Sequence, residues 1–341
     1  MKKVFKSMLF VAMSLIVAGG FTACSEDEVK PTDKTKELVG PKPAKVVINV
    51  YEGHLHGYAG FHENKPYDGV KIMDKPQVFV FTMQNGKWVA DAKNPPYLYA
   101  MSYNQMHNSE ATVSHALDIK YYDEAGNLIN GQFIENGKSD HYQHFFVVEN
   151  QKAFPDFDKK LDNPANREFM RYDYVDPTPW NKTIHSGEGQ YNGLKDPLGF
   201  KGIASFGYCR QTCNLKIMLM ESYNKKNVRL KELEFRDNWG KPVEKYSKIP
   251  DWTPTPEQLK NEKWYPTITI PVMVYMDRNE LGEGEANVTL DMKEDEVPAF
   301  FKRLINTLKF SFNMTYKEAL TELYYRLNGE PAPHDNSGFW F

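Results

Sequence analysis

Residues 45–57 read KVVINVYEGHLHG, and this stretch indicates the fold class more clearly than any other part of the chain. Val46, Ile48 and Val50 alternate with other side chains, so they fall on one face of an extended strand. The opposite face is also partly apolar.

Short runs of the same kind recur along the chain and are separated by turn residues. They are PQVFVFTM, WVAD, HALDIKYYD, HYQHFFVVE, GIASFGY, NLKIMLMES, LKELEFRD and TITIPVMVYMD. This pattern predicts a mainly β protein built from one or two antiparallel, sandwich-like domains. Because residues 152–198 are irregular and rich in proline, we place a domain boundary there and expect one β domain over 45–160 and a second over 161–341.

The carboxyl-terminal part changes its hydrophobic period. Phe301, Leu304 and Leu308 recur at helical spacing. Thr315 and Glu318 have the spacing of a capping box at the start of a further helix over 316–327. The second domain is therefore expected to end in a short helical pair whose apolar stripes face the core.

Composition and charge exclude several classes of protein. The 341 residues are 26% charged and 41% hydrophobic, with a mean hydropathy of -0.61, which fits neither a disordered chain nor a multi-span membrane protein. The net charge is -3, from 42 basic and 45 acidic residues. Because three of the basic residues are lysines before residue 24, their removal leaves a charge of -6. We expect no nucleic-acid partner for such an acidic chain.

Residues 1–23 have the parts of a secretory signal peptide: a basic start, a short apolar stretch and small residues before Cys24. Phe21-Thr22-Ala23-Cys24 resembles the lipobox of bacterial lipoproteins, which implies cleavage before Cys24 and acylation of that residue. The alternative is an ordinary signal peptide with an incidental cysteine. Residues 24–44 are rich in charge and proline, and we expect them to form a flexible tether between the lipid and the folded part.

Ser25-Glu26-Asp27-Glu28 resembles the acidic export tag of surface lipoproteins of Bacteroidetes, although a solvated acidic linker would have the same composition. Together with GHLHG, HYQHFF and DPLGFKG, these motifs resemble an incompletely characterised family of such lipoproteins. The resemblance implies a protein anchored by lipid in the outer membrane and facing the cell exterior. It also implies a capture role beside an outer-membrane active-transport receptor, with haem, metals, vitamins or glycans as cargo.

Histidines gather in two places. His54, His56 and His62 lie in EGHLHGYAGFHE, and His141 and His144 lie in DHYQHFF. Because a spacing of two places His54 and His56 on one face of a strand, both imidazoles could reach one ion. Neutral imidazole binds Zn, Cu and Fe, including haem iron. Our leading hypothesis is therefore capture of haem or a transition metal, and the alternative is five half-buried histidines with local hydrogen bonds.

Cys209 and Cys213 remain once Cys24 is acylated. In GYCRQTCNL they have strand-like sequence on both sides and three residues between them. A hairpin would place them opposite each other, so we predict a disulfide, with a thiolate metal site or a redox pair as alternatives.

The sequence contains no hydrolase, nucleotide-binding or peptidase signature, so we assign no catalytic residue and expect a non-enzymatic protein. Two other hypotheses belong to different classes. A glycan-binding module would use aromatic rings in loop-like stretches, with Trp180, Trp239, Trp252 and Trp264 as candidates. A structural or adhesive surface protein would bind no small ligand.

Overall fold

The computed structural model describes residues 40–56, 60–63, 70, 72, 75–103, 113–154, 169–184, 186–232, 248–281 and 288–328. The chain is mainly β and ends in a helical pair, as predicted. The strands are β1 (Lys45–His56), β2 (Gly60–Glu63), β3 (Gln77–Gln84), β4 (Lys87–Ala90), β5 (Leu98–Ser102), β6 (Ser114–Tyr122), β7 (Tyr142–Ala153), β8 (Met170–Tyr174), β9 (Pro177–Thr178), β10 (Gln190–Tyr191), β11 (Lys201–Phe206), β12 (Gln211–Glu221), β13 (Leu230–Glu232), β14 (Lys248–Pro250), β15 (Lys263–Trp264) and β16 (Ile268–Asp277). The α-helices are α1 (Asn130–Ile134), α2 (Pro256–Asn261), α3 (Ala299–Phe312) and α4 (Tyr316–Asn328).

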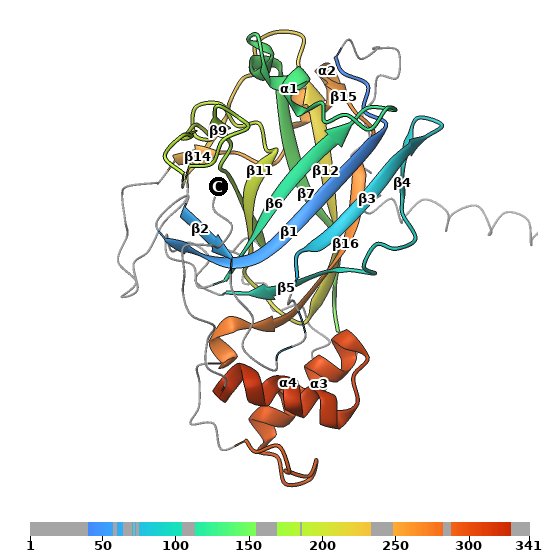
Figure 1. Ribbon diagram of the computed structural model, residues 1–341, viewed down its shortest axis with the longest axis vertical. Coiled ribbons are helices and arrows are strands. Elements are labelled where there is room, and N and C mark those ends of the chain that lie inside the picture. Colours follow the sequence, from blue (N-terminus) through green and yellow to red (C-terminus); the bar gives the residue numbers. More distant parts are fainter. Residues whose placement is uncertain are drawn as a thin grey trace, which may run out of the picture.

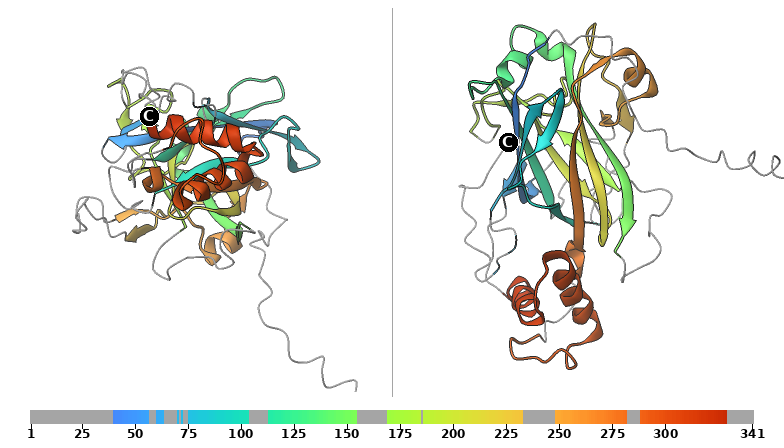
Figure 2. Two further views of the ribbon diagram at one scale, coloured as in Figure 1. Left: turned by 90° about the horizontal axis from the view of Figure 1, so that it is seen from below. Right: turned by 90° about the vertical axis from the view of Figure 1, so that its right-hand side faces the viewer.

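One large sheet dominates the described part of the chain (Figure 1). Its order is β15-β12-β16-β5-β11-β6-β1-β3-β4, with β2 beside β1, β7 beside β12 and β8 beside β11. The sheet is mixed, because β5 runs parallel to both of its neighbours, β11 and β16. The sheet curls so that β1, β3 and β6 form one layer and β7 and β12 lie in the opposite layer (Figures 1 and 2).

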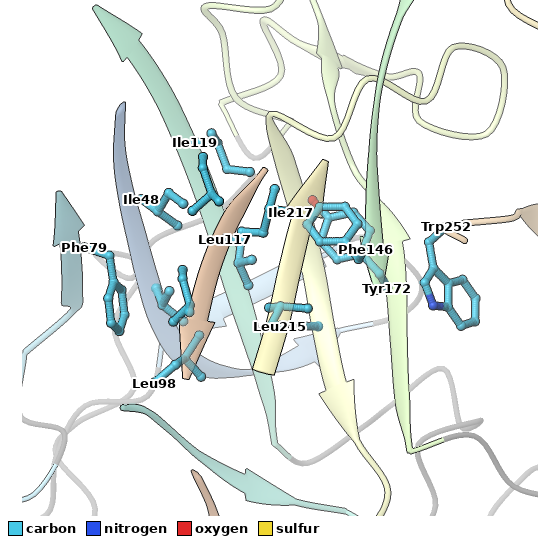
Figure 3. Packing of buried hydrophobic residues seen from close by; sticks show 14 of the residues in the cluster. Ile48, Phe79, Leu98, Leu117, Ile119, Phe146, Tyr172, Leu215, Ile217 and Trp252 are labelled. Carbon is cyan, nitrogen blue, oxygen red and sulfur yellow. The ribbon is translucent and has the colours of Figure 1, made fainter. Parts of the chain in front are cut away.

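The main hydrophobic core lies between these two layers (Figure 3). Ile48 and Ile119 enter it from β1 and β6, and Leu215 and Ile217 enter it from β12. Apolar residues alternate along β1 and β6 because every second side chain of these strands faces the interior. The faces of β1 and β6 that point away from the core are then available for other contacts.

A second core joins the helical pair to one end of the sheet. Leu304, Leu308 and Leu323 are fully buried there together with Tyr275 of β16. The predicted capping box is present: the Thr315 hydroxyl accepts a hydrogen bond from the Glu318 amide at 3.3 Å, and the Glu318 carboxylate accepts one from the Thr315 amide at 2.8 Å. The helical period of the sequence thus marks the face of α3 that is buried.

The expected division into β domains over 45–160 and 161–341 needs correction. β7, from the first range, pairs with β12, from the second, along almost its whole length. β6 likewise pairs with β11, and β5 with β16. The two ranges therefore build one sheet, and within the stretch at 152–198 the described strand β8 pairs with β11 in that same sheet.

Candidate functional site

The structure brings two of the predicted histidines together. His54 and His62 are opposite each other in the β1–β2 ladder, and their ring centroids are 5.2 Å apart at an interplanar angle of 81°. His62 is buried and His54 is half-buried. Gly53 permits this close pairing, because a Cβ at that position would collide with the His62 carbonyl and the Phe61 ring. The pair could supply two nitrogen ligands to one ion.

The other predicted metal ligands do not join this pair within the described residues. His56 ends β1 opposite Gly60, but its side chain lies outside the described part of the molecule. His141 lies with Nδ1 3.1 Å from the Ser222 carbonyl. Where the chain is described, no group of three or more His, Cys, Asp or Glu side chains is arranged around a common point.

His144 belongs to the main core. Its Nδ1 lies 2.9 Å from the Leu198 carbonyl and its Nε2 lies 3.0 Å from the Tyr121 hydroxyl, so both ring nitrogens are occupied. Burial lowers the pKa of His144 to about 4. Tyr121 pairs with Val46, eight residues before His54, which is about 26 Å along an extended strand. His144 therefore does not share a site with His54 and His62.

The predicted disulfide is absent, since Cys209 and Cys213 are both free thiols. The hairpin that would have brought them together does not form, because β5 and β16 lie between β11 and β12 in the sheet. Cys213 instead faces the main core from β12. Burial raises the pKa of both thiols to about 12, which keeps them protonated. Cys24 lies outside the described residues.

A pocket lies on the side of β6 that faces away from the main core. Leu117 and Ile119 point into the core, so Asp118 and Lys120 must point outward. The two outward side chains form an ion pair at 2.8 Å, and Lys201 of β11 stands directly opposite Asp118 in the ladder. The sheet thus supplies the floor of the pocket with charged groups.

The loop that follows β8 supplies the wall. The Asp176 carboxylate accepts hydrogen bonds from the amides of Leu198 at 3.2 Å, Gly199 at 2.7 Å and Lys201 at 2.9 Å. These bonds tie the beginning of the loop to its end. Trp180 belongs to this loop, and its indole N–H donates a hydrogen bond to the Glu135 carboxylate at 3.1 Å.

The pocket has a volume of about 270 Å³. It combines one half-buried tryptophan ring, apolar groups from the loop and α1, and several charged or amide groups. The lining residues are Asp118, Lys120, Leu128, Asn130, Ile134, Asp176, Pro177, Trp180, Asn181, Leu198, Phe200 and Lys201. Such a mixture of apolar surface with a few placed polar groups is typical of small-molecule sites.

The pocket contains equal numbers of basic and acidic side chains. Burial works against the charged form of Lys120, but the ion pair with Asp118 outweighs it and raises the pKa of the amine. Burial raises the pKa of Asp176 to about 6, against the opposing effect of the backbone N–H groups that it accepts. Burial lowers the pKa of Lys201. With two amines and two carboxyl groups, the pocket is suited to a ligand without net charge.

Sequence reasoning identified one residue of this pocket, Trp180. It did not identify Asp118, Lys120 or Lys201, although the alternation in HALDIKYYD already places the two charged residues of β6 on one face. The other candidate tryptophans lie elsewhere: Trp252 is buried in the main core, and Trp264 packs against Phe145. Trp239 lies outside the described residues.

Comparisons of the chain with models of protein families, with curated proteins and with solved structures found no match. Over the described ranges, none of the helices has the length and apolar character needed to cross a bilayer.

Proposed function

We propose that the protein is a surface lipoprotein that captures a saccharide in the pocket beside Trp180. The observation that carries this proposal is the combination, in one pocket of about 270 Å³, of an indole ring with charged groups on the outer face of the sheet. The ring offers an apolar face to the C–H groups of a sugar. Asp118, Lys120 and Asn181 offer acceptors and donors to its hydroxyls.

The fixed position of the Trp180 ring supports binding. Its indole N–H is already bonded to Glu135, so the ring is held in place before a ligand arrives. Because a ligand then does not have to order the side chain, less conformational entropy is lost on binding. The volume lies just below the roughly 300–1,000 Å³ of sites for drug-sized ligands, so we assign one sugar ring to the pocket.

The proposal includes the location inferred from the sequence. Acylation at Cys24 would anchor the protein in the outer membrane, with the folded part at the cell exterior beside an active-transport receptor. The described chain begins at Gly40, and the Pro41 carbonyl accepts a hydrogen bond from the Tyr265 hydroxyl at 2.8 Å. This contact lies at the end of the sheet opposite α3 and α4 (Figure 1), so that helical end would point away from the membrane.

Calorimetric titration of residues 25–341 with a panel of sugars tests the proposal. The panel contains glucose, galactose, mannose and N-acetylglucosamine, and trisaccharides of glucose, mannose and N-acetylglucosamine. We expect saturable binding of at least one sugar, a loss of at least about tenfold in affinity for Trp180→Ala, and partial retention for Trp180→Phe.

Trp88→Ala is the matched control, because this half-buried tryptophan lies on β4, outside the pocket. Its affinity for the sugar should equal that of the unaltered protein. Binding that Trp180→Ala leaves intact would contradict the proposed site. The absence of binding to every sugar would contradict the function.

Capture of a metal or haem is a second candidate, and the ring contact between His54 and His62 favours it. Elemental analysis and absorption spectra after exposure to copper, zinc and haem test it on protein purified without a histidine tag. We expect stoichiometric uptake that His54→Ala with His62→Ala abolishes and Trp180→Ala leaves unchanged. No uptake would mean that both histidines have only a structural role in the pairing of β1 with β2.

A further inference from the structure

The polar floor of the Trp180 pocket continues beyond the pocket across the sheet. Asn49 of β1 is directly opposite Asp118 of β6, and Asp118 is directly opposite Lys201 of β11. Residues in register on neighbouring strands have side chains on the same face, so these three form one row. The row crosses three strands and is about 10 Å long.

The two ends of this row differ in their surroundings. At Lys201 the loop with Trp180 rises beside the sheet and forms the wall of the pocket. At Asn49 the side chains on the same face of β1 and β3 are half-buried or exposed, and Val78, opposite Asn49 on β3, is 42% exposed. In Figure 1 this layer, with β6, β1 and β3, faces the viewer. The pocket thus adjoins an accessible surface on its β1 side.

The residues on that surface have the chemistry of a second sugar subsite. The Asn49 amide has two donors and an acceptor, and among the described residues it has no hydrogen-bond partner. Tyr51 lies on the same face two residues further along β1, and its half-buried ring packs against the second core. Burial, and to a lesser degree the charge of Asp118, raise the pKa of Tyr51, so its hydroxyl stays protonated at neutral pH.

We infer that the cargo is an oligosaccharide, with one ring in the Trp180 pocket and the following ring or rings over Asp118, Asn49 and Tyr51. This inference rests on the proposed function and specifies its ligand. A monosaccharide would fill the pocket and leave the outer part of the row unused. An oligosaccharide would cover both and would continue towards β3, where Val78 is 42% exposed.

The test compares each monosaccharide of the panel with the trisaccharide of the same unit, on residues 25–341. We expect the preferred trisaccharide to bind at least about tenfold more tightly than its monosaccharide. Asn49→Ala should reduce the affinity for the trisaccharide by about three- to tenfold, the effect of one hydrogen bond. The same variant should leave the affinity for the monosaccharide unchanged.

Thr269→Ala serves as the control, because Thr269 is an exposed residue on β16, outside the row. Its affinities for both sugars should match those of the unaltered protein. A second variant, Tyr51→Phe, removes one hydroxyl while keeping the ring, and it should also weaken only the trisaccharide. Circular dichroism of each variant confirms that it is folded.

The outcomes separate this inference from the function on which it rests. The extended site would be overturned by equal affinities for monosaccharide and trisaccharide, together with no change in trisaccharide affinity for Asn49→Ala or Tyr51→Phe. The proposal of the Trp180 pocket would then still stand. Failure of the unaltered protein to bind any sugar would overturn the proposed function, and the inference with it.

Discussion

At the scale of the residue, Lys226 is a buried cation with a structural task. Its ammonium donates to the carbonyls of Ser139 at 2.8 Å, Tyr142 at 2.8 Å and Pro197 at 3.0 Å, and it also pairs with Asp196. It therefore joins the start of β7 to the end of the pocket loop. We predict that Lys226→Met lowers the free energy of unfolding by about 2–4 kcal/mol, because four acceptors lose their donor.

Urea denaturation measures this change, and the neighbouring residue provides the control. The Lys225 side chain is 75% exposed and pairs with Asp140. Because exposed ion pairs contribute little, Lys225→Met should alter the free energy of unfolding by less than about 1 kcal/mol. Equal effects of the two substitutions would mean that the buried lysine is not a structural link.

Two buried histidines predict sensitivity to acid. His115 and His144 are fully buried, and burial lowers the pKa of each to about 4, against about 6.5 in an unfolded chain. As the pH falls below about 6.5 the unfolded state takes up these protons first. The stability that depends on the neutral imidazoles is therefore complete above pH 6.5 and is lost towards pH 4, by up to about 3 kcal/mol for each histidine.

Asp176 and Glu52 oppose this loss of stability in acid. Burial raises their pKa values, so each carboxylate takes up a proton more readily in the folded state than in the unfolded state. The measurement is therefore a comparison of slopes. Urea unfolding of His144→Gln should give a lower free energy at pH 7.5, but that free energy should fall less between pH 6.5 and pH 4.5 than in the unaltered protein. Parallel slopes would show that His144 does not contribute to the acid sensitivity.

At the scale of the element, the beginning of α4 depends on its cap. The Thr315 hydroxyl and the Glu318 carboxylate satisfy amide groups that the first turn leaves without partners. We predict that Thr315→Ala lowers the free energy of unfolding by about 1 kcal/mol. Thr321→Ala, within the same helix, should have a smaller effect, since its hydroxyl bonds only the Lys317 carbonyl. Thermal unfolding of both variants measures the difference.

Elements with strong local signals could be predicted from the sequence. The stripe of Phe301, Leu304 and Leu308 predicts α3, and the alternation in residues 45–51 predicts β1. Gly126 has a φ of 83° in the turn that joins Tyr122 to Leu128, as the composition of that turn indicates. The short helices α1 and α2 were not predicted, since five or six residues carry too little periodicity.

At the scale of the whole molecule, the single sheet makes each half of the chain depend on the other. Separated at residue 160, β6 would lose β11, β5 would lose β16 and β7 would lose β12. We predict that fragments 40–160 and 161–341 are each unfolded when produced alone, with no cooperative thermal transition by circular dichroism. A cooperative transition of either fragment would restore the two-domain interpretation.

The sequence by itself determined the class of the fold, the helical pair with its cap, and the apolar face of β1. These features depend on residues within a few positions of one another, so alternation, helical period and capping spacing record them. Only the tertiary structure decided which strands are neighbours. That choice separated Cys209 from a hairpin partner, divided the histidines between two ends of the sheet, and placed Asn49, Asp118 and Lys201 in one row beside Trp180. Strand pairing at large sequence separation depends on the burial of the whole sheet, which no local pattern records.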